Sequence, residues 1–333
     1  MRRITRAACA AAALLLAAPA WCEDKTILMV GGVEKQIYLP AILAQRLGYF
    51  RDQGLEVELQ SEPSGVSAAD VLLAGAAHGV IGAYDHAIDL QAKGKSVQSV
   101  VQFTIAPGEV ELVGARLARP IASPADFSGR NLGVTGLGSS TSFLTQYLAV
   151  LHGVKPTELT LLPVGSGDTF IAALEQGRID AGMTTEPTAS RLVAAGVARV
   201  LVDLRTPEAT HKALGGLYPF ACLYMQTAWI NGHRDQVQRL TNALVKALRY
   251  INTHSAGDIA AQLPPAYFAG NRPLYVQSLA ASKSMFTPDG SMPAEGPATV
   301  LKVLSAVSKV VRGKTIDLSK TYTSDFVNAV PGS

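Results

Sequence analysis

The serine- and threonine-rich segment at residues 136–141 offers the clearest chemistry in this chain of 333 residues. It has the sequence GLGSST and lies between an apolar stretch that predicts a strand and a stretch that predicts a helix. Free backbone N–H groups at a helix start, together with nearby hydroxyls, can hold a sulfonate, carboxylate or phosphate oxygen. We therefore predict an anion site at Gly138, Ser139, Ser140 and Thr141. Capping of the helix by a serine, which needs no ligand, is the alternative.

The same segment resembles part of the GxGxxG fingerprint of dinucleotide-binding proteins. Thr141 stands where the third glycine belongs, and no suitably placed acid closes the following strand. Dinucleotide binding is therefore not expected, and we predict no other cofactor.

A sequence pattern that occurs twice, called the repeated phrase below, supplies the next candidate ligand-binding residues. Residues 72–85 (LLAGAAHGVIGAYD) and 174–187 (LEQGRIDAGMTTEP) lie 102 positions apart (174 − 72 = 102). Each is typical of a helix end, a glycine that terminates it, a short apolar strand and a polar loop. The repeat indicates two similar α/β halves with a cleft between them. Two units built alike but not duplicated would give the same pattern.

The loops that end the two phrases should face this cleft. Loops beyond the carboxyl ends of parallel strands are the usual ligand positions in such sheets. We therefore predict that Tyr84 and Asp85 on one side, and Glu186 on the other, contact a ligand. A tyrosine can stack on a ligand or form a hydrogen bond with it. Asp85 could instead cap the helix predicted at residues 87–93.

Four further positions are weaker candidates for the same cleft. Gly32 follows the first predicted strand, and Ser64 and Gly65 follow the second. Tyr218 precedes a strand that crosses between the halves, so it could reach the hinge or pack in a core.

The sequence contains none of the catalytic motifs or metal-ligand spacings that we looked for. It has no G-x-S-x-G elbow, no H-E-x-x-H and no phosphate-binding P-loop, and its six histidines are scattered. His86 lies beside a candidate loop, but a lone histidine there is more often an ordinary polar contact. We therefore predict no catalytic residues and no metal site, and the chain is not expected to be an enzyme.

The order of the predicted elements indicates how these residues are positioned. Alternating strands and helices with short links predict parallel sheets, and hence an α/β fold of two Rossmann-like lobes. Residues 109–115 and 220–226 flank the second unit and are predicted to cross between the lobes as a two-strand hinge. We assign residues 1–20 to a signal peptide, 21–110 to lobe 1, 111–225 to lobe 2 and 226–333 to C-terminal helices that return to lobe 1.

The first residues are typical of a cleaved secretory signal. Arginines at positions 2, 3 and 6 precede an apolar run over residues 7–18, and a small-x-small site follows at residues 18–20. The run is too short for a membrane span, which needs about 20 apolar residues. A periplasmic location follows. Lipid attachment at Cys22 is not expected, because the bulky Trp21 precedes it.

Charge and cysteine content exclude several classes of protein. The formal net charge of +3 belongs entirely to the signal, because removing its three arginines leaves 26 basic residues (29 − 3 = 26) against 26 acidic ones. No nucleic-acid partner is therefore expected. Cys222 lies in an apolar run and is most simply a buried thiol. We expect a monomer.

Four segments together resemble the periplasmic substrate-binding proteins of ABC importers, in the branch that serves nitrate, sulfonates, taurine and thiamine-precursor pyrimidines. Residues 48–57 (GYFRDQGLEV) resemble the branch's G-Y-F-x-x-x-G-L-x-V signature. Residues 73–75 and 177–182 (LAG and GRIDAG) resemble its L-x-x-G-x-x-D-x-G phrases, and residues 126–133 (DFSGRNLG) its D-L-x-G-K-x-I-G segment. The resemblance covers essentially the whole mature chain.

The resemblance implies a type II binding protein that closes on a small solute and presents it to a membrane permease. His78 departs from the first phrase, where aspartate is usual, and that position should be structural. If Asp85 and Glu186 both face the cleft, a zwitterion or a cationic heterocycle fits better than a simple anion such as nitrate.

Two other classes of protein share this architecture. Relatives that make the thiamine pyrimidine use a cysteine-rich, iron-dependent site, and the mature chain has only Cys22 and Cys222. The effector domain of a transcription regulator is the other class, against which the signal peptide and the missing helix-turn-helix argue. The sequence does not name the solute.

Overall fold

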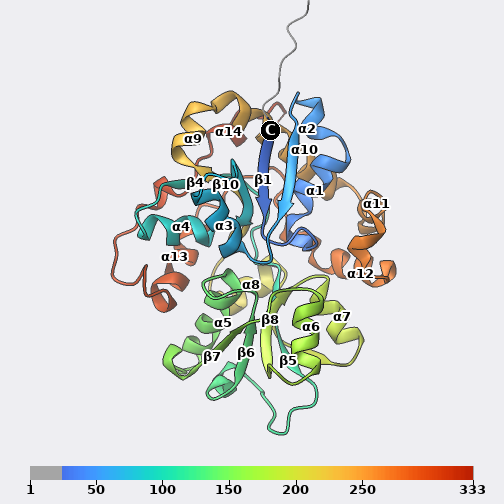
Figure 1. The fold of residues 1–333 in the computed structure, drawn as a ribbon, viewed down its shortest axis with the longest axis vertical. Coiled ribbons are helices and arrows are strands. Elements are labelled where there is room, and N and C mark those ends of the chain that lie inside the picture. Colours follow the sequence, from blue (N-terminus) through green and yellow to red (C-terminus); the bar gives the residue numbers. More distant parts are fainter. Residues whose placement is uncertain (1–24, 333) are drawn as a thin grey trace, which may run out of the picture.

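Two five-stranded sheets organise the chain into two lobes, as the computed structural model in Figure 1 shows. The structure describes residues 25–332, so the predicted signal peptide and Cys22 lie outside the described residues. This architecture confirms the predicted α/β fold of two lobes.

The sheet of lobe 1 has the strand order β2-β1-β3-β10-β4. The strands β1, β2 and β3 are parallel, whereas β10 runs antiparallel to both of its neighbours, β3 and β4. The bounds are Thr26–Val30 for β1, Val57–Ser61 for β2, Gly79–Ala83 for β3, Val97–Gln102 for β4 and Ala221–Gln226 for β10.

The sheet of lobe 2 has the order β7-β6-β8-β5-β9. Here β6, β7 and β8 are parallel, and β5 runs antiparallel to β8 and β9. The bounds are Glu109–Gly114 for β5, Asn131–Val134 for β6, Thr160–Pro163 for β7, Ala181–Thr185 for β8 and Ala198–Leu204 for β9.

The two sheets have the same plan. Strands β3 and β8, which end the two copies of the repeated phrase, are each central and each pair with one antiparallel strand. In both lobes that antiparallel strand directly follows a crossing between the lobes. The matching order supports the two-halves interpretation of the repeat at the level of topology.

Helices cover both sheets and extend the first lobe. The helices α1–α4 of the first unit span Leu39–Arg46, Tyr49–Asp52, Gly65–Leu73 and Asp85–Ala92. The helices α5–α8 of the second unit span Ser140–Leu151, Asp168–Glu175, Thr188–Ala194 and Pro207–Leu214. The C-terminal helices α9–α14 span Thr227–Gly232, Arg234–Thr253, Ala256–Ala261, Arg272–Ser282, Gly296–Val307 and Asp325–Asn328.

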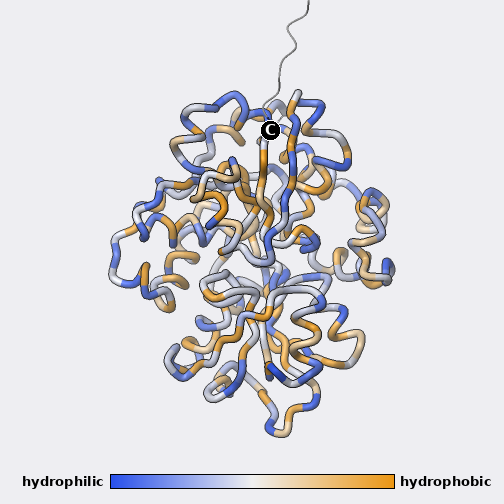
Figure 2. The backbone as a smooth tube through the Cα atoms, viewed as in Figure 1, coloured by the Kyte–Doolittle hydropathy of each residue, from blue (hydrophilic) through white to orange (hydrophobic). Residues whose placement is uncertain are grey.

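The C-terminal helices pack mainly on lobe 1. The long helix α10 is strongly amphipathic and lies against α1, α2 and β4. Helix α13 contacts both α4 of lobe 1 and α5 of lobe 2, so it spans the boundary between the lobes. Figure 2 shows hydrophobic residues along the central strands of each lobe, whereas the outer segments carry both hydrophobic and hydrophilic residues.

The chain crosses between the lobes twice, and the two crossing segments lie side by side. The N–H of Tyr218 donates to the carbonyl of Ile105 at 3.2 Å, and the N–H of Phe220 donates to the carbonyl of Thr104 at 3.0 Å. Gly108 belongs to the first crossing and has a φ of +66°, and a Cβ there would lie 2.4 Å from Ile37 Cγ2. Only glycine fits this tight point of the hinge.

The structure differs from the sequence-based assignment in two places. Strand β10 belongs to the sheet of lobe 1, although we assigned residues 111–225 to lobe 2. Its apolar residues pair with β3 and β4, because the second crossing lies before this strand rather than within it. Likewise β5 pairs with β8 and β9 over its whole length, so neither strand that we predicted as a hinge strand crosses between the lobes itself. Strand β9 and helices α7 and α8 complete lobe 2 and were not predicted.

Within residues 25–332, no helix is both long enough and apolar enough to span a membrane.

Candidate functional site

A small polar cavity lies between the two lobes. Its volume is about 20 Å³, which is about the space that one water molecule needs. Both lobes and the hinge contribute to its walls. The lining residues are Lys35, Ile37, Tyr38, Gly65, Ala83, His86, Glu109, Thr135, Ser139, Ser140, Thr141, Thr185 and Phe220.

The predicted anion loop forms one wall. Helix α5 begins at Ser140, and the side chain of Ser139 makes no capping hydrogen bond to it. The Ser139 hydroxyl instead donates to the Gly136 carbonyl at 2.6 Å and lies 2.7 Å from the Thr141 hydroxyl. Serine capping therefore does not explain this loop. The first N–H groups of α5 have no acceptors within the helix and lie beside the cavity.

Asp85 joins the two lobes. Ser140 Oγ of lobe 2 donates to Asp85 Oδ1 at 2.9 Å, and the hydroxyl of Tyr218 in the hinge donates to Asp85 Oδ2 at 3.2 Å. Helix α4 begins at Asp85 itself, with Tyr84 in the capping position, so the alternative role of Asp85 as a helix cap is wrong. Burial raises the pKa of Asp85, while His86 and the two hydroxyl donors act in the opposite direction.

Lobe 1 also contributes two basic side chains that face the cavity. Lys35 Nζ donates to the Gly31 carbonyl at 2.5 Å. Burial lowers the pKa of this lysine, and the carboxylates of Glu34 and Glu109 oppose that shift. His86 is buried, and its Nε2 atom has no hydrogen-bond partner in the part of the chain that the structure describes. A Cβ on Gly65 would lie 2.7 Å from this nitrogen, so glycine leaves the room that the imidazole occupies.

Lobe 2 contributes an acid where β5 begins. Glu109 is opposite Thr185 in the pairing of β5 with β8, and both side chains line the cavity. Glu109 Oε2 and Thr185 Oγ1 are buried, and neither has a hydrogen-bond partner among the described residues. Burial, and then the charge of Asp85, raises the pKa of Glu109 well above its ordinary value, against the effect of Lys35.

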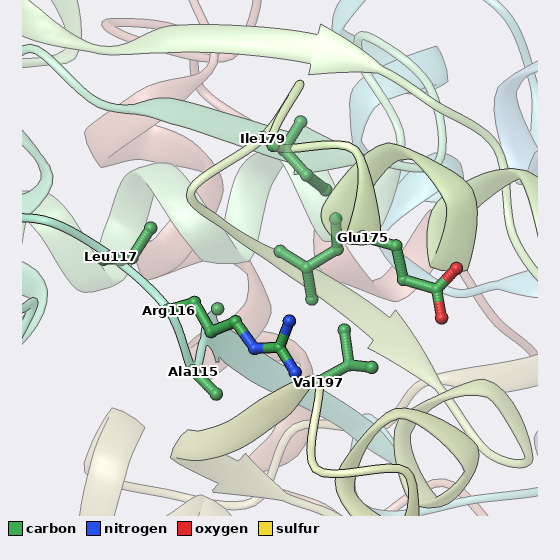
Figure 3. A pocket seen from close by; sticks show the side chains of 9 residues that line it. Ala115, Arg116, Leu117, Glu175, Ile179 and Val197 are labelled. Atoms are coloured by element: carbon green, nitrogen blue, oxygen red, sulfur yellow. The ribbon is translucent and has the colours of Figure 1, made fainter.

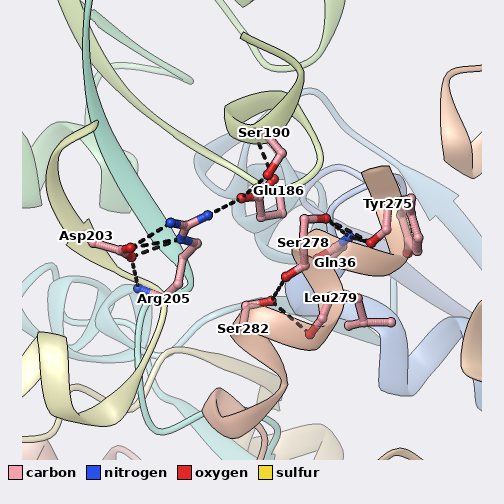
Figure 4. Close-up of polar contacts among 9 residues, drawn as sticks. All are labelled: Gln36, Glu186, Ser190, Asp203, Arg205, Tyr275, Ser278, Leu279 and Ser282. Carbon is pink, nitrogen blue, oxygen red and sulfur yellow. Dashed lines mark hydrogen bonds and ion pairs between the residues drawn. The ribbon is translucent and has the colours of Figure 1, made fainter. Parts of the chain in front are cut away.

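Two of the predicted ligand residues direct their side chains elsewhere. The hydroxyl of Tyr84 bonds to the hydroxyl of Thr321, so it faces the C-terminal segment rather than the cavity. Glu186 is buried, but its carboxylate is bound within lobe 2, as Figure 4 shows. Arg205 Nη1 lies 2.6 Å from Glu186 Oε1, and Ser190 donates to the same carboxylate through its N–H and its hydroxyl.

The remaining predicted residues lie around the cavity. Ser64 caps helix α3 by accepting from the N–H of Ser67, and its hydroxyl faces Gly136 across the lobe boundary. Gly32 lies against the Lys35 side chain, and Gly138 has open space beside it. Gly65, Ser139, Ser140 and Thr141 line the cavity directly.

Sequence reasoning missed Lys35, Glu109 and Thr135 as wall residues, and treated His86 as an ordinary polar contact. It placed the loop that begins at Thr185 beside the cleft, but did not name Thr185 as a contact. Lys35 could have been identified as a wall residue from the sequence, because it lies near Gly32 in the first strand-to-helix loop. Glu109 could also have been identified, since a charged residue begins a strand that is otherwise apolar at alternate positions.

A larger cavity of about 400 Å³ lies at the far end of lobe 2. Figure 3 shows the side chains of Arg116 and Glu175 beside the apolar residues of its wall. None of the predicted ligand residues lines it. Among residues 25–332, no group of three or more His, Cys, Asp or Glu side chains gathers as a metal site would require.

Comparisons with known proteins agree with this architecture. The family model described as NMT1/THI5 like matches residues 37–256. A solved structure of a Bordetella bronchiseptica RB50 protein is 33% identical, covers 91% of this chain and 96% of that chain, and has a TM-score of 0.87. The alkanesulfonate-binding protein of Xanthomonas axonopodis pv. citri, solved with bound MOPS, is 18% identical, covers 91% and 99%, and has a TM-score of 0.71.

Among curated proteins, a 4-amino-5-hydroxymethyl-2-methylpyrimidine phosphate synthase of Saccharomyces cerevisiae is 25% identical over 165 residues. The match covers 49% of this chain and 46% of the synthase, so the chain spans about half the length of this curated relative.

Proposed function

Since the chain belongs to the NMT1/THI5-like family and encloses a polar cavity between two hinged lobes, we propose that it is the solute-binding component of an ABC importer. It captures a small anionic or zwitterionic solute, such as a sulfonate or a taurine-like compound, and delivers it to a membrane permease. The observation that carries the proposal is the bond from Ser140 to Asp85, which ties the two lobes together beside the start of helix α5.

Opening of the lobes is part of this function. The cavity of about 20 Å³ is too small for a sulfonate to enter between closed lobes. The two adjacent crossings form a hinge on which the lobes separate. A solute that enters then meets the N–H groups of α5 on one side and the basic residues of lobe 1 on the other. Closure removes both from water, which strengthens each polar contact.

The location and partners belong to the same proposal. The protein is exported to the periplasm by a signal at residues 1–20 and is released without lipid at Cys22. It works as a monomer with an inner-membrane permease and binds no nucleic acid, in line with the balanced charge of the mature chain.

A thermal-shift screen tests the proposal, because a ligand that binds the native state raises the melting temperature. The probes are ethanesulfonate, taurine, nitrate, small carboxylates and pyrimidines. Replacing Ser139 and Ser140 together by alanine should abolish the shift given by the best probe. Ser142→Ala is the matched control, since this buried serine of α5 does not line the cavity. An unchanged affinity in the double variant would contradict an anion site at the helix start.

A second candidate function is binding or synthesis of a thiamine-precursor pyrimidine, which the name of the yeast relative favours. An iron-dependent synthase needs clustered ligands, and the residues that the structure describes supply no such cluster. The residues therefore do not fit an iron site. Iron binding by the purified protein, together with turnover to the pyrimidine phosphate, would support the synthase instead.

A further inference from the structure

One oxygen in the cavity wall has no hydrogen-bond partner among residues 25–332, which the structure describes. Glu109 is only 2% exposed, and its Oε2 atom has neither a hydrogen bond nor contact with solvent. The opposite residue on β8, Thr185, also has an unpaired hydroxyl oxygen. A buried acceptor without a donor raises the free energy of the protein. A ligand group that enters the cavity and donates a hydrogen bond to this oxygen removes that penalty and so binds more tightly.

The charges around the cavity point to the same kind of group. Its walls and immediate neighbours carry the carboxyls of Glu109 and Asp85 against the ammonium of Lys35, with His86 beside them. Asp85 already accepts from Ser140 and Tyr218, and Lys35 already donates to Gly31. Glu186, the other acid that the sequence suggested, is neutralised by Arg205. Glu109 is thus the acid at this cavity that has an oxygen still free to accept.

We propose that Glu109 selects the solute, and that it selects one with a nitrogen donor such as an ammonium, an amidinium or a protonated ring nitrogen. The anionic end of such a solute lies at the start of α5, and its donor end lies against β5 at Glu109. This inference rests on the proposed function and narrows it: solutes that carry both ends are bound, and plain anions are bound poorly.

The alternative is a protonated Glu109 that donates to an oxygen of a plain anion. The two roles respond differently to Glu109→Gln. The amide is a neutral isostere that can still donate, so it preserves a contact to an anion. It removes the charge that attracts an ammonium, so it weakens the contact to a nitrogen donor.

Calorimetry on the full mature protein with matched pairs of probes tests the inference. Taurine is compared with ethanesulfonate, β-alanine with propionate, and 4-aminopyrimidine with pyrimidine. At least one amino-bearing member should bind about tenfold more tightly than its partner. Glu109→Gln should reduce that preference to near unity. Glu111→Gln is the matched control, since this buried acid lies two residues further along the same strand and does not line the cavity.

The outcomes separate this inference from the proposed function. Equal binding of the two members of each pair, or a preference that survives Glu109→Gln, overturns the role of Glu109 while the binding function stands. Loss of the preference in Glu109→Gln and also in Glu111→Gln overturns it as well, because the effect would then not be specific to the cavity. Failure of every probe to bind removes the binding function, and the inference with it.

Discussion

Each copy of the repeated phrase has a buried acid at its end or next to it, and the two acids make different contacts. Asp85 begins the helix after β3 and Glu186 lies in the loop after β8, so the two acids follow matching strands of the two sheets. Asp85 accepts from Ser140 in the other lobe and from Tyr218 in the hinge. Glu186 pairs with Arg205 and Ser190 inside its own lobe. The segment after the matching strand therefore makes contact between the lobes in one half and stabilises its own lobe in the other.

The two acids differ because a cation lies next to Glu186 and none is bonded to Asp85 in the described structure. Arg205 lies just beyond β9 and supplies a full positive charge to Glu186, so this acid is satisfied whether the lobes are open or closed. Asp85 has hydroxyl donors only, and both come from outside its own sheet. The bond from Ser140 can form only when the lobes are closed, so the pairing of Asp85 depends on closure in a way that the pairing of Glu186 does not.

Replacing Arg205 by alanine should have the largest effect on this comparison. It leaves Glu186 buried without its counter-charge, which we expect to cost about 3 kcal/mol of folding free energy. Urea denaturation followed by circular dichroism measures this loss. Arg191→Ala is the control, because its ion pair with Asp168 is largely exposed and should contribute less than about 1 kcal/mol. Equal losses in the two variants would show that Glu186 does not depend on Arg205.

Asp85→Asn should act on closure rather than on folding. Asp85 accepts hydrogen bonds from two hydroxyls, whereas the asparagine amide has only one acceptor oxygen. The closed form should therefore be destabilised by about 2 kcal/mol relative to the open form. Small-angle scattering or fluorescence transfer between labels on the lobes would detect the larger open population. If the scattering curve stayed the same and only the melting temperature fell, Asp85 would be a stability residue like Glu186.

Glu111 extends the comparison to an acid that has neither a cation nor a contact to the other lobe. Its carboxylate accepts from Thr145 at 2.7 Å, and burial raises its pKa from 4.5 to about 8. Between these values the folded chain keeps a proton that the unfolded chain has lost, so stability falls as the pH rises and levels off above about 8. Glu111→Gln should remove about 1.4 kcal/mol per pH unit from this slope. Melting curves at pH 5, 6, 7 and 8 measure it, and an unchanged slope would assign the pH dependence to other groups.

Tyr84→Phe should have the smallest effect. Tyr84 occupies the place next to Asp85, but its hydroxyl bonds to Thr321 on the C-terminal segment. The variant should lose about 1 kcal/mol of stability and bind the best probe with unchanged affinity. A weaker affinity would return Tyr84 to the ligand site that the sequence suggested.

Much of the fold followed from local patterns. Glycines such as Gly75 and Gly177 have positive φ values of +77° and +67°, and each ends a helix where the repeat placed it. Apolar strands between these points were identified from composition. The missed strand β9 has a mixed burial pattern, with exposed Arg199 and Val200 in an edge strand, so the apolar signal was weak.

The site was predicted less completely than the fold. The serine loop was found because adjacent residues form it, and Gly65, Ser139, Ser140 and Thr141 do line the cavity. The side chains of Glu186 and Tyr84 bond to other residues of the protein, so their predicted contacts with a ligand remain predictions. Arg205 lies 19 positions beyond Glu186 and Thr321 lies 237 positions beyond Tyr84, and nothing in the local sequence links either pair.

The sequence by itself determined the two lobes, because glycine ends, apolar strands and helix starts act over a few residues and need no distant partner. The tertiary structure alone decided which acid joins the two lobes. Asp85 lies 55 positions from Ser140 and 133 from Tyr218, and these groups meet only because the chain crosses between the lobes twice and the lobes pack together. The role of a buried carboxylate depends on the donor or cation that it contacts. In this protein, that partner is distant in sequence and reaches the carboxylate only when the whole chain folds.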